Sequence, residues 1–264
     1  MKKYYLEVIN CAIEAGKEIM KIYLSEDFGV SYKEDNSPLT LADKKSNEVI
    51  MQTLNKIDIP IISEENKEII FEDRKNWSEF WLVDPLDGTK EFINRRGDFT
   101  VNIALIKDNK PVFGVIYVPA KEKLYFGSIE IGSYKKTEVN STFDDLEKLK
   151  TACERLPIEK NDDVYRVIAS KSHFNKETED FIENLKSTKP NMELINVGSS
   201  LKLCSIADGT ADIYPRFGPT MEWDIAAGHA IVKSAGGKVI QAENKKEVVY
   251  NKENLLNPYF IVSM

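Results

Sequence analysis

The chain has 264 residues, of which 42% are hydrophobic and 30% are charged, and its formal net charge at pH 7 is −7. This length and composition predict a soluble globular protein with a substantial core, folded as one large or two small domains. The negative charge argues against non-specific nucleic-acid binding, which needs a basic surface. No run is long enough to cross a membrane, and charged residues interrupt the N-terminal stretch, so we predict neither an integral membrane segment nor a signal peptide.

Cysteine and histidine are scarce in this chain. The three cysteines, Cys11, Cys153 and Cys204, are widely spaced and form no C-x-x-C pair, which predicts neither a disulfide framework nor a zinc site and fits a reducing cytoplasm. The two histidines, His173 and His229, are too few for histidine-rich zinc hydrolases or phosphohistidine phosphatases. No cysteine precedes an arginine at the spacing that cysteine phosphatases require. Carboxylate-bound metal therefore remains as a route to phosphoryl chemistry.

The N-terminal part of the chain alternates helices and strands before it changes to strands with short turns. The patterns predict helices over 4–24 and 41–57, a short strand over 30–33, a turn over 35–38, a buried strand over 59–63, and an apolar strand from 81 that stops at Asp84. An antiparallel meander follows over 100–107, 112–118 and 123–126. The polar stretch 135–163 is interpreted as edge structure and connection containing a subdomain boundary.

The C-terminal part alternates strand and helix, which favours a largely parallel sheet covered by helices. We expect strands over 165–170, 193–197, 211–214, 238–241 and 260–262, and helices over 176–186, 199–208 and 224–235. The predicted fold class is therefore α/β (α+β), with an N-terminal α+β half over 1–150 and a C-terminal α/β half over 151–264.

The stretch from Trp81 to Phe92 is the most informative in the chain. Asp84 is followed by a proline, which favours an extended Asp84 and a turn, and Asp87 is followed by Gly88, which permits unusual backbone angles. Two carboxylates held this close repel each other unless a proton or a cation lies between them. Magnesium suits such oxygen ligands when phosphate is the other ligand. A surface turn without a ligand is the alternative.

Two further acidic groups precede this stretch. Glu64 follows the strand over 59–63, and it would meet Asp84 if the two strands were neighbours in one sheet. A solvated strand end is the alternative. Thr40 and Asp43 fit a capping box at a helix start, which explains Asp43 without any catalytic role.

Three segments near the C-terminus also carry polar groups. Asp224 begins a helix rich in small residues, where it serves either as an ordinary N-cap or as a carboxylate that close packing of the helix on a sheet would fix precisely. The segment 198–202, with two serines and Lys202, opens another helix after a strand and suits an anion. Arg216 lies in a predicted loop over 214–219, suited to a phosphate or to a structural ion pair.

Together these motifs resemble the magnesium-dependent, lithium-sensitive inositol monophosphatase superfamily. The resemblance rests on the Asp-Pro-Leu-Asp-Gly-Thr run at 84–89, the upstream Glu64, and the Trp-Asp-x-Ala-Ala-Gly run at 223–228. It extends over 35–40, 100–105, 198–202 and 214–220, and so over nearly the whole chain. Lys-Glu-Phe at 90–92 makes the chain similar to the bacterial CysQ branch, the 3′(2′),5′-bisphosphate nucleotidases. The turn over 127–134 departs from this pattern, since it lacks the usual Gly-Ala-Trp.

The resemblance implies a layered αβαβα fold and a set of roles for individual residues. It implies two or three magnesium ions with Glu64, Asp84, the carbonyl of Leu86, Asp87 and Asp224 as ligands. It implies catalytic roles for Asp43, Thr89 and Glu64, with Asp43 and Thr89 positioning the attacking water. It implies substrate contacts from Gly88, Thr89, His173, Ser199, Ser200, Lys202, Arg216 and Asp224.

The activity implied by the resemblance is hydrolysis of 3′-phosphoadenosine 5′-phosphate to AMP and phosphate, with the sulfated analogue as a second substrate. An inositol or sugar phosphatase is the closest alternative, although a substrate with one phosphate leaves Lys202 and Arg216 without a role. A noncatalytic protein that senses metal and nucleotide is the alternative from another class. We expect a cytoplasmic protein, and both a homodimer and peripheral association with the inner face of the cell membrane stay open.

Overall fold

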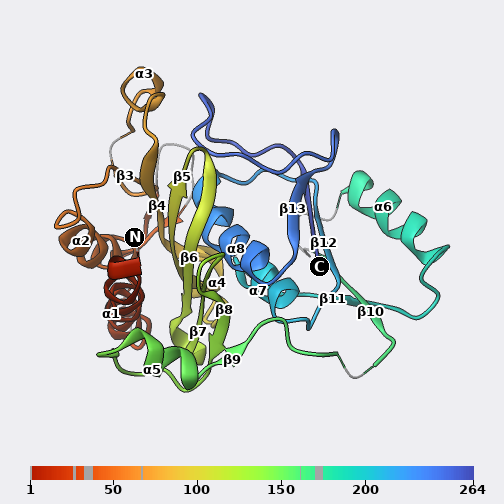
Figure 1. The fold of residues 1–264 in the computed structure, drawn as a ribbon, viewed down its shortest axis with the longest axis horizontal. Helices are drawn as coiled ribbons and strands as arrows, with labels where there is room; N and C mark the ends of the chain where they lie inside the picture. The colour runs from red at the N-terminus through yellow and green to blue at the C-terminus, as the bar shows by residue number, and fades with distance from the viewer. Residues whose placement is uncertain (1, 26–27, 33–37, 67, 161, 170–174) are drawn as a thin grey trace.

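The computed structural model describes residues 2–25, 28–32, 38–66, 68–160, 162–169 and 175–264. Within these residues the chain forms five layers, and Figure 1 shows them side by side: α1 and α2, a large sheet, α7 and α8, a second sheet, and α6. The described residues therefore confirm the expected αβαβα arrangement.

The large sheet is mainly antiparallel, as predicted for the N-terminal half. Its seven strands lie in the order β3 (Ile61–Ser63), β4 (Glu79–Asp87), β5 (Thr100–Lys107), β6 (Lys110–Val118), β7 (Lys123–Ser128), β8 (Gly132–Lys136) and β9 (Glu154–Arg155). Only the β3–β4 pair among these is parallel. A small separate hairpin pairs β1 (Ser31–Tyr32) with β2 (Pro38–Leu39).

The second sheet is mixed, whereas the sequence predicted a mostly parallel one. Its order is β11 (Met192–Ile195), β10 (Tyr165–Ile168), β12 (Ile213–Arg216), β14 (Phe260–Ser263) and β13 (Lys238–Gln241). The pairs that β10 forms are parallel, but β14 runs antiparallel to both of its neighbours. Alternation of strand and helix predicts parallel neighbours. This expectation does not apply to β14, because an irregular segment and not a helix connects it to β13.

Helices cover both faces of the large sheet. The helices are η1 (Lys2–Tyr4), α1 (Tyr5–Tyr23), α2 (Leu41–Leu54), α3 (Phe71–Arg74), α4 (Thr89–Ile93), η2 (Pro119–Lys121), α5 (Leu146–Thr151), α6 (Lys176–Lys186), α7 (Leu201–Ala207) and α8 (Glu222–Ser234). One apolar cluster fills the space between the sheet and α1 and α2, and a second lies between the sheet, α7, α8 and the second sheet. The two faces of the large sheet thus contribute to two separate cores.

Helix α8 lies unusually close to the large sheet. A Cβ added to Gly114 of β6 would come within 2.2 Å of the carbonyl oxygen of Ala227, and one added to Gly228 would come within 2.6 Å of Leu203 in α7. Small residues on both sides are what permit this approach. The position of α8, and of the residues at its N-terminus, is consequently fixed by both the sheet and α7.

Several predicted boundaries were wrong for identifiable reasons. Strand β4 does not stop at Asp84 but continues past Pro85 to Asp87, which pairs with Thr100 after an irregularity in the register. Strand β8 and helix α5 were missed because polar, charged residues hide their periodicity. Arg216 ends β12 and does not lie in a loop, and Asp224 is the third residue of α8 and not its N-cap.

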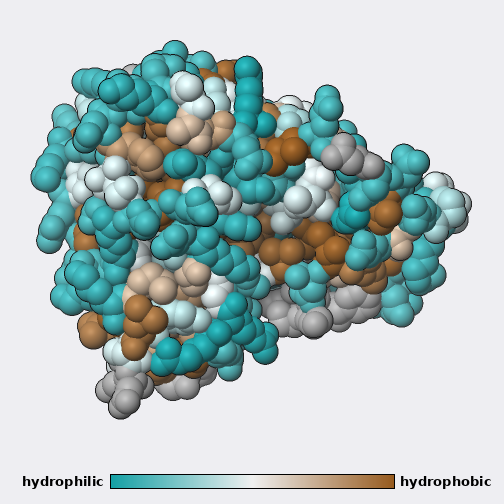
Figure 2. Space-filling view, turned by 90° about the horizontal axis from the view of Figure 1, so that it is seen from below, coloured by the Kyte–Doolittle hydropathy of each residue, from teal (hydrophilic) through white to brown (hydrophobic). Residues whose placement is uncertain are grey.

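The face of the molecule shown in Figure 2 is mostly polar, as expected for a chain with 30% charged residues. The face shown in Figure 2 carries mostly hydrophilic side chains, with hydrophobic ones gathered in smaller groups. Among the described residues, no helix combines the length and the hydropathy that a membrane span requires.

Candidate active site

The parallel pairing of β3 with β4 brings two acidic residues to one edge of the large sheet. Ser63 is in register with Val83, and the backbone N–H of Glu64 donates to the carbonyl of Val83 at 3.1 Å. Glu64 and Asp84, the next residues along each strand, therefore lie side by side. The prediction that Glu64 and Asp84 meet is confirmed, although Asp84 lies within β4 and not at its end.

The chain between Asp84 and Gly88 is held by local hydrogen bonds. The amide of Leu86 donates to Asp84 Oδ1 at 3.0 Å, and the carbonyl of Pro85 accepts from Ser46 Oγ of α2 at 2.7 Å. Gly88 has φ +93°, which strongly favours glycine, and a Cβ there would make a tight contact of 3.0 Å with the carbonyl oxygen of Asp98. This turn directs the carbonyl of Leu86 and the side chain of Thr89 to the same region.

Asp43 and Thr89 form a pair across α2 and α4. Thr89 Oγ1 lies 3.3 Å from Asp43 Oδ1 and 3.4 Å from the carbonyl oxygen of Leu86. The predicted capping box is also confirmed, since the amide of Thr40 donates to Asp43 Oδ2 at 2.7 Å. Burial raises the pKa of Asp43, and the hydrogen bonds from Thr40 partly oppose that shift. One carboxylate thus caps the helix with one oxygen and reaches Thr89 with the other.

Asp224 reaches the same edge from the other core. It is anchored because Oδ2 accepts the backbone N–H of Met221 at 2.8 Å, as in a capping box. The first residue of the helix, Glu222, is fully buried and accepts the amides of Asn251 at 2.8 Å and Lys252 at 3.1 Å. The first turn of α8, including Glu222 and Asp224, is therefore held in place by hydrogen bonds within the protein.

The carboxylates at this edge interact strongly with one another. The pKa of Asp84 is raised well above its usual value, first by burial and then by the negative charges of Glu64, Asp87 and Asp224. The pKa of Asp224 is raised well above its usual value by burial and by Asp87. Mutual repulsion among oxygen ligands is what a hard divalent cation relieves, so the donor set fits such an ion.

The candidate metal ligands do not all point toward one centre. Within the residues described, no group of three or more His, Cys, Asp or Glu side chains is arranged so that it could hold a metal ion. Asp87 is directed to other donors: its Oδ2 accepts from Ser199 Oγ at 2.5 Å and from the backbone N–H of Ser200 at 2.6 Å. The metal-ligand assignments of Glu64, Asp84, Leu86, Asp87 and Asp224 therefore stay predictions.

A buried hydroxyl network supports the two serines from behind. Thr100 Oγ1 of β5 lies 2.7 Å from Ser199 Oγ and 2.8 Å from Ser200 Oγ, and Ser200 Oγ donates to Asn102 Oδ1 at 2.7 Å. Ser199 adopts φ +51°, an uncommon backbone angle for a residue other than glycine. The N-terminus of α7 is thereby joined to the end of β4 through Asp87.

A pocket of about 350 Å³ opens beside Asp87 and Asp224. Its lining brings together the predicted contacts Gly88, Ser199, Ser200, Lys202, Arg216 and Asp224, and it adds Lys90, Glu91 and Arg96, which the sequence analysis did not single out. We name it the basic pocket, because it carries four basic residues against three acidic ones. Lys90 and Glu91 could have been predicted to line the pocket, because they directly follow Thr89. Arg96 could not, because it lies in a polar turn without a distinctive pattern.

Lys202 and Arg216 lie close together at this pocket. Burial is the main cause that lowers the pKa of Lys202, the Arg216 charge lowers it further, and Asp87 opposes the shift. Arg216 is 8% exposed; one terminal nitrogen donates to the carbonyl of Pro219 at 2.9 Å, while its buried Nε has no hydrogen-bond partner among the described residues. Two nearby cations with unused donors suit an anionic group. His173 lies outside the described residues.

The family model for the inositol monophosphatase family matches residues 2–259. The chain belongs to the inositol monophosphatase family. Membership of this family of metal-dependent phosphatases agrees with a site built from carboxylates and few histidines.

The similarity to individual relatives extends over nearly the whole chain. The chain is 44% identical over 241 residues to "3′(2′),5′-bisphosphate nucleotidase CysQ" of Buchnera aphidicola subsp. Acyrthosiphon pisum (strain APS), covering 90% of this chain and 84% of that protein. It is 40% identical over 261 residues to the protein of the same name from Escherichia coli (strain K12), covering 98% of each. The crystal structure of CysQ from Bacteroides thetaiotaomicron, a bacterial member of the family, superposes with a TM-score of 0.90 at 46% identity and covers 98% of both chains.

Proposed function

We propose that the chain is a 3′(2′),5′-bisphosphate nucleotidase that hydrolyses 3′-phosphoadenosine 5′-phosphate to AMP and phosphate. The observation that carries the proposal is one pocket whose lining combines the carboxylates Asp87 and Asp224 with two neighbouring cations, Lys202 and Arg216. A substrate with two phosphates suits this combination, because metal bound by the carboxylates would hold one phosphate and the cations the other. The relatives named bisphosphate nucleotidase support this choice. The sulfated analogue, with its phosphosulfate held by Lys202 and Arg216, is a second proposed substrate, which would place the enzyme in sulfur assimilation and nucleotide recycling.

The metal that fits the carboxylates best is magnesium, in two or three ions. Glu64, Asp84, the carbonyl of Leu86, Asp87 and Asp224 would hold them. When bound, magnesium supplies positive charge that stabilises the phosphoryl group and lowers the pKa of water. Filling the site would also neutralise Asp87 and Asp224, so that Lys90, Arg96, Lys202 and Arg216 dominate the charge of the basic pocket. The pocket would then attract the second phosphate.

Asp43 and Thr89 are proposed to position the attacking water. The Thr89 hydroxyl can donate to Asp43 Oδ1 at 3.3 Å and present its oxygen to a water, which passes its proton toward the Asp43 carboxylate. The water oxygen bonds to phosphorus as the bond from phosphorus to the 3′-oxygen breaks. The 3′-oxygen takes up a proton from solvent, and Asp43 returns to solvent the proton that it accepted. Burial of Asp43 favours its role as a proton acceptor, since burial raises the pKa of the carboxyl.

The three cysteines support a cytoplasmic location, because each is a free thiol in the described structure. The net charge of −7 supports the absence of a nucleic-acid partner.

The proposal is tested by measuring phosphate release with magnesium from three substrates: 3′-phosphoadenosine 5′-phosphate, inositol 1-phosphate and fructose 1,6-bisphosphate. We expect fast release from the adenosine compound alone, inhibited by lithium. Preference for inositol 1-phosphate would overturn the assignment of Lys202 and Arg216 and leave the carboxylate site intact. Binding of the adenosine compound with no phosphate released from any substrate would instead favour a noncatalytic sensor.

A further inference from the structure

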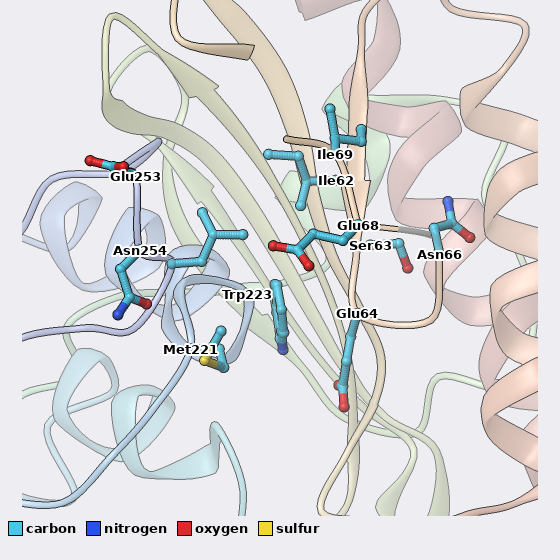
Figure 3. A pocket seen from close by; sticks show the side chains of 11 residues that line it. Ile62, Ser63, Glu64, Asn66, Glu68, Ile69, Met221, Trp223, Glu253 and Asn254 are labelled. Atoms are coloured by element: carbon cyan, nitrogen blue, oxygen red, sulfur yellow. The ribbon is translucent and has the colours of Figure 1, made fainter. Parts of the chain in front are cut away.

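A second and larger cavity lies on the other side of the candidate metal ligands. It has a volume of about 590 Å³ and is enclosed by the end of β3 with the loop that follows it, by the start of α8, and by residues 253–255. Figure 3 shows it from close by. Glu64 is the residue of the proposed metal site that lines it, and none of the residues proposed to contact the nucleotide does so.

The walls of this cavity are fixed by one buried arginine. Arg74, only 2% exposed, donates from Nε to the carbonyl of Ile69 at 3.2 Å, and from its terminal nitrogens to the carbonyls of Lys252 at 2.8 Å and Glu253 at 3.0 Å. The same guanidinium reaches Asn251 Oδ1 at 2.9 Å. The loop after β3 and the C-terminal loop are therefore joined by one rigid, charged side chain, which holds the cavity open.

The chemistry of the lining differs from that of the basic pocket. Ile62, Ile69 and Leu255 supply apolar walls, and Trp223 supplies an aromatic ring. Three glutamates, Glu64, Glu68 and Glu253, belong to the lining, and none of its described residues is Lys, Arg or His. A phosphate would be repelled here, whereas a positively charged group would be attracted. We name this cavity the acidic pocket.

The glutamates do not converge on a single point. In Figure 3 the carboxylate of Glu68 points toward Trp223, while those of Glu64 and Glu253 point away from that ring. An inorganic divalent ion needs several oxygen ligands around one centre, which this arrangement lacks. One carboxylate beside an indole ring, with aliphatic side chains around them, instead matches an ammonium group attached to an apolar body.

We propose that the acidic pocket is a binding site for a small organic cation, whose ammonium lies between Glu68 and Trp223 and whose apolar part packs against Ile62, Ile69 and Leu255. The site is distinct from the basic pocket and does not depend on the nucleotidase assignment. Attraction to the carboxylate and to the ring face supplies selectivity for charge, and the apolar walls supply selectivity for a hydrocarbon body.

The test compares three probes of one shape and different charge: phenethylamine, 2-phenylethanol and phenylacetate. Binding to the full chain is measured by calorimetry and by tryptophan fluorescence, with magnesium in excess throughout. We expect saturable binding of phenethylamine, and at least tenfold weaker binding of the neutral and anionic probes. Glu68→Gln should weaken phenethylamine binding about fivefold, the upper end for loss of a charge pair at an exposed position such as this one. Trp223→Leu should weaken it about tenfold.

Glu243→Gln provides a matched control, because it removes the same charge at an exposed position outside the cavity and should leave probe binding unchanged. Equal binding of the three probes, or binding of phenethylamine unaffected by Glu68→Gln, would overturn the proposal. So would competition by AMP, since it would show that the cavity belongs to the nucleotide site. Failure of the phosphate-release experiment would leave these outcomes unaffected, so the two proposals fail separately.

Discussion

The two pockets lie on either side of one group of carboxylates, yet they carry opposite charge. The basic pocket is lined by Asp224 and Ile225, and the acidic pocket by Trp223, so consecutive residues of α8 face different cavities. Successive residues of a helix point about 100° apart, which is how one helix start serves two sites. The difference teaches that the elements lining each pocket set its charge. Helices α4 and α7, strand β12 and the turn after α4 bring the basic residues of one pocket, whereas Glu64, Glu68 and Glu253 bring the acidic residues of the other.

The largest expected effect comes from Asp87, on the basic side. Asp87→Asn keeps the side-chain volume and removes the charge, so we expect turnover of 3′-phosphoadenosine 5′-phosphate to fall at least about 10³-fold, as when a group acting in the transition state is lost. Circular dichroism should show an unchanged fold. Asp58→Asn, at an exposed position outside both pockets, is the matched control and should retain full turnover. Unchanged phosphate release by Asp87→Asn would refute the metal assignment.

The next effect should separate the role of the cations in the basic pocket from that of its carboxylates. Lys202→Met removes one cation, and we expect KM for 3′-phosphoadenosine 5′-phosphate to rise about 10- to 100-fold, in line with loss of a charge-assisted hydrogen bond. With 3′-AMP, which lacks the 5′-phosphate, the rise should be much smaller. Lys238→Met, at an exposed site on β13, is the control. Equal rises for both substrates would mean that Lys202 does not meet the second phosphate.

Metal removal tests whether the carboxylates between the pockets form one site. Because magnesium would bind only the folded chain, a concentration 100 times its dissociation constant should stabilise the protein by about 2.7 kcal/mol. Thermal unfolding with magnesium and with EDTA measures the gain. The gain should shrink in Asp84→Asn and stay the same in Asp58→Asn. A gain that is equal in all three proteins would place magnesium elsewhere.

The smallest expected effect is a dependence of stability on pH, caused by the buried His229 of α8. His229 is fully buried, its Nδ1 lies 2.9 Å from the Tyr250 hydroxyl, and its Nε2 lies 3.3 Å from Glu247. Burial lowers the pKa of His229 although Glu247 opposes the shift, so protonation favours the unfolded chain and stability falls as the pH drops below about 6.5.

His229→Gln should remove this slope, which is at most about 1.4 kcal/mol per pH unit for one proton. Urea unfolding at pH 7 and pH 5, with magnesium in excess, measures it. The Glu247 carboxyl, whose pKa is lowered to about 2 first by its hydrogen bond with His229, loses its contribution only as the pH falls from about 4.5 toward 2, outside this window. An identical slope in His229→Gln would show that other groups cause the pH dependence.

Much of the site could be predicted because its residues are placed by local rules. Glu64 follows β3 and Asp84 lies at the matching position of β4, so pairing of the two strands was enough to bring them together, and the Thr40–Asp43 capping box is encoded within four residues. The direction of the Asp87 side chain could not be predicted, because its partners Ser199 and Ser200 come from a distant segment. The acidic pocket escaped prediction for the same reason, since three segments far apart in sequence form it.

The close packing of α8 on β6 also has a consequence for the order of events during synthesis. Strands β3 to β6 of the large sheet and four of the five candidate metal ligands leave the ribosome more than a hundred residues before Asp224 does. Until then, the face of that sheet bearing Ala104, Ile106 and Ile116 has no cover from α8. A nascent or truncated chain that ends before residue 222 would therefore carry both an incomplete catalytic centre and an exposed apolar surface, which is the combination that chaperones bind.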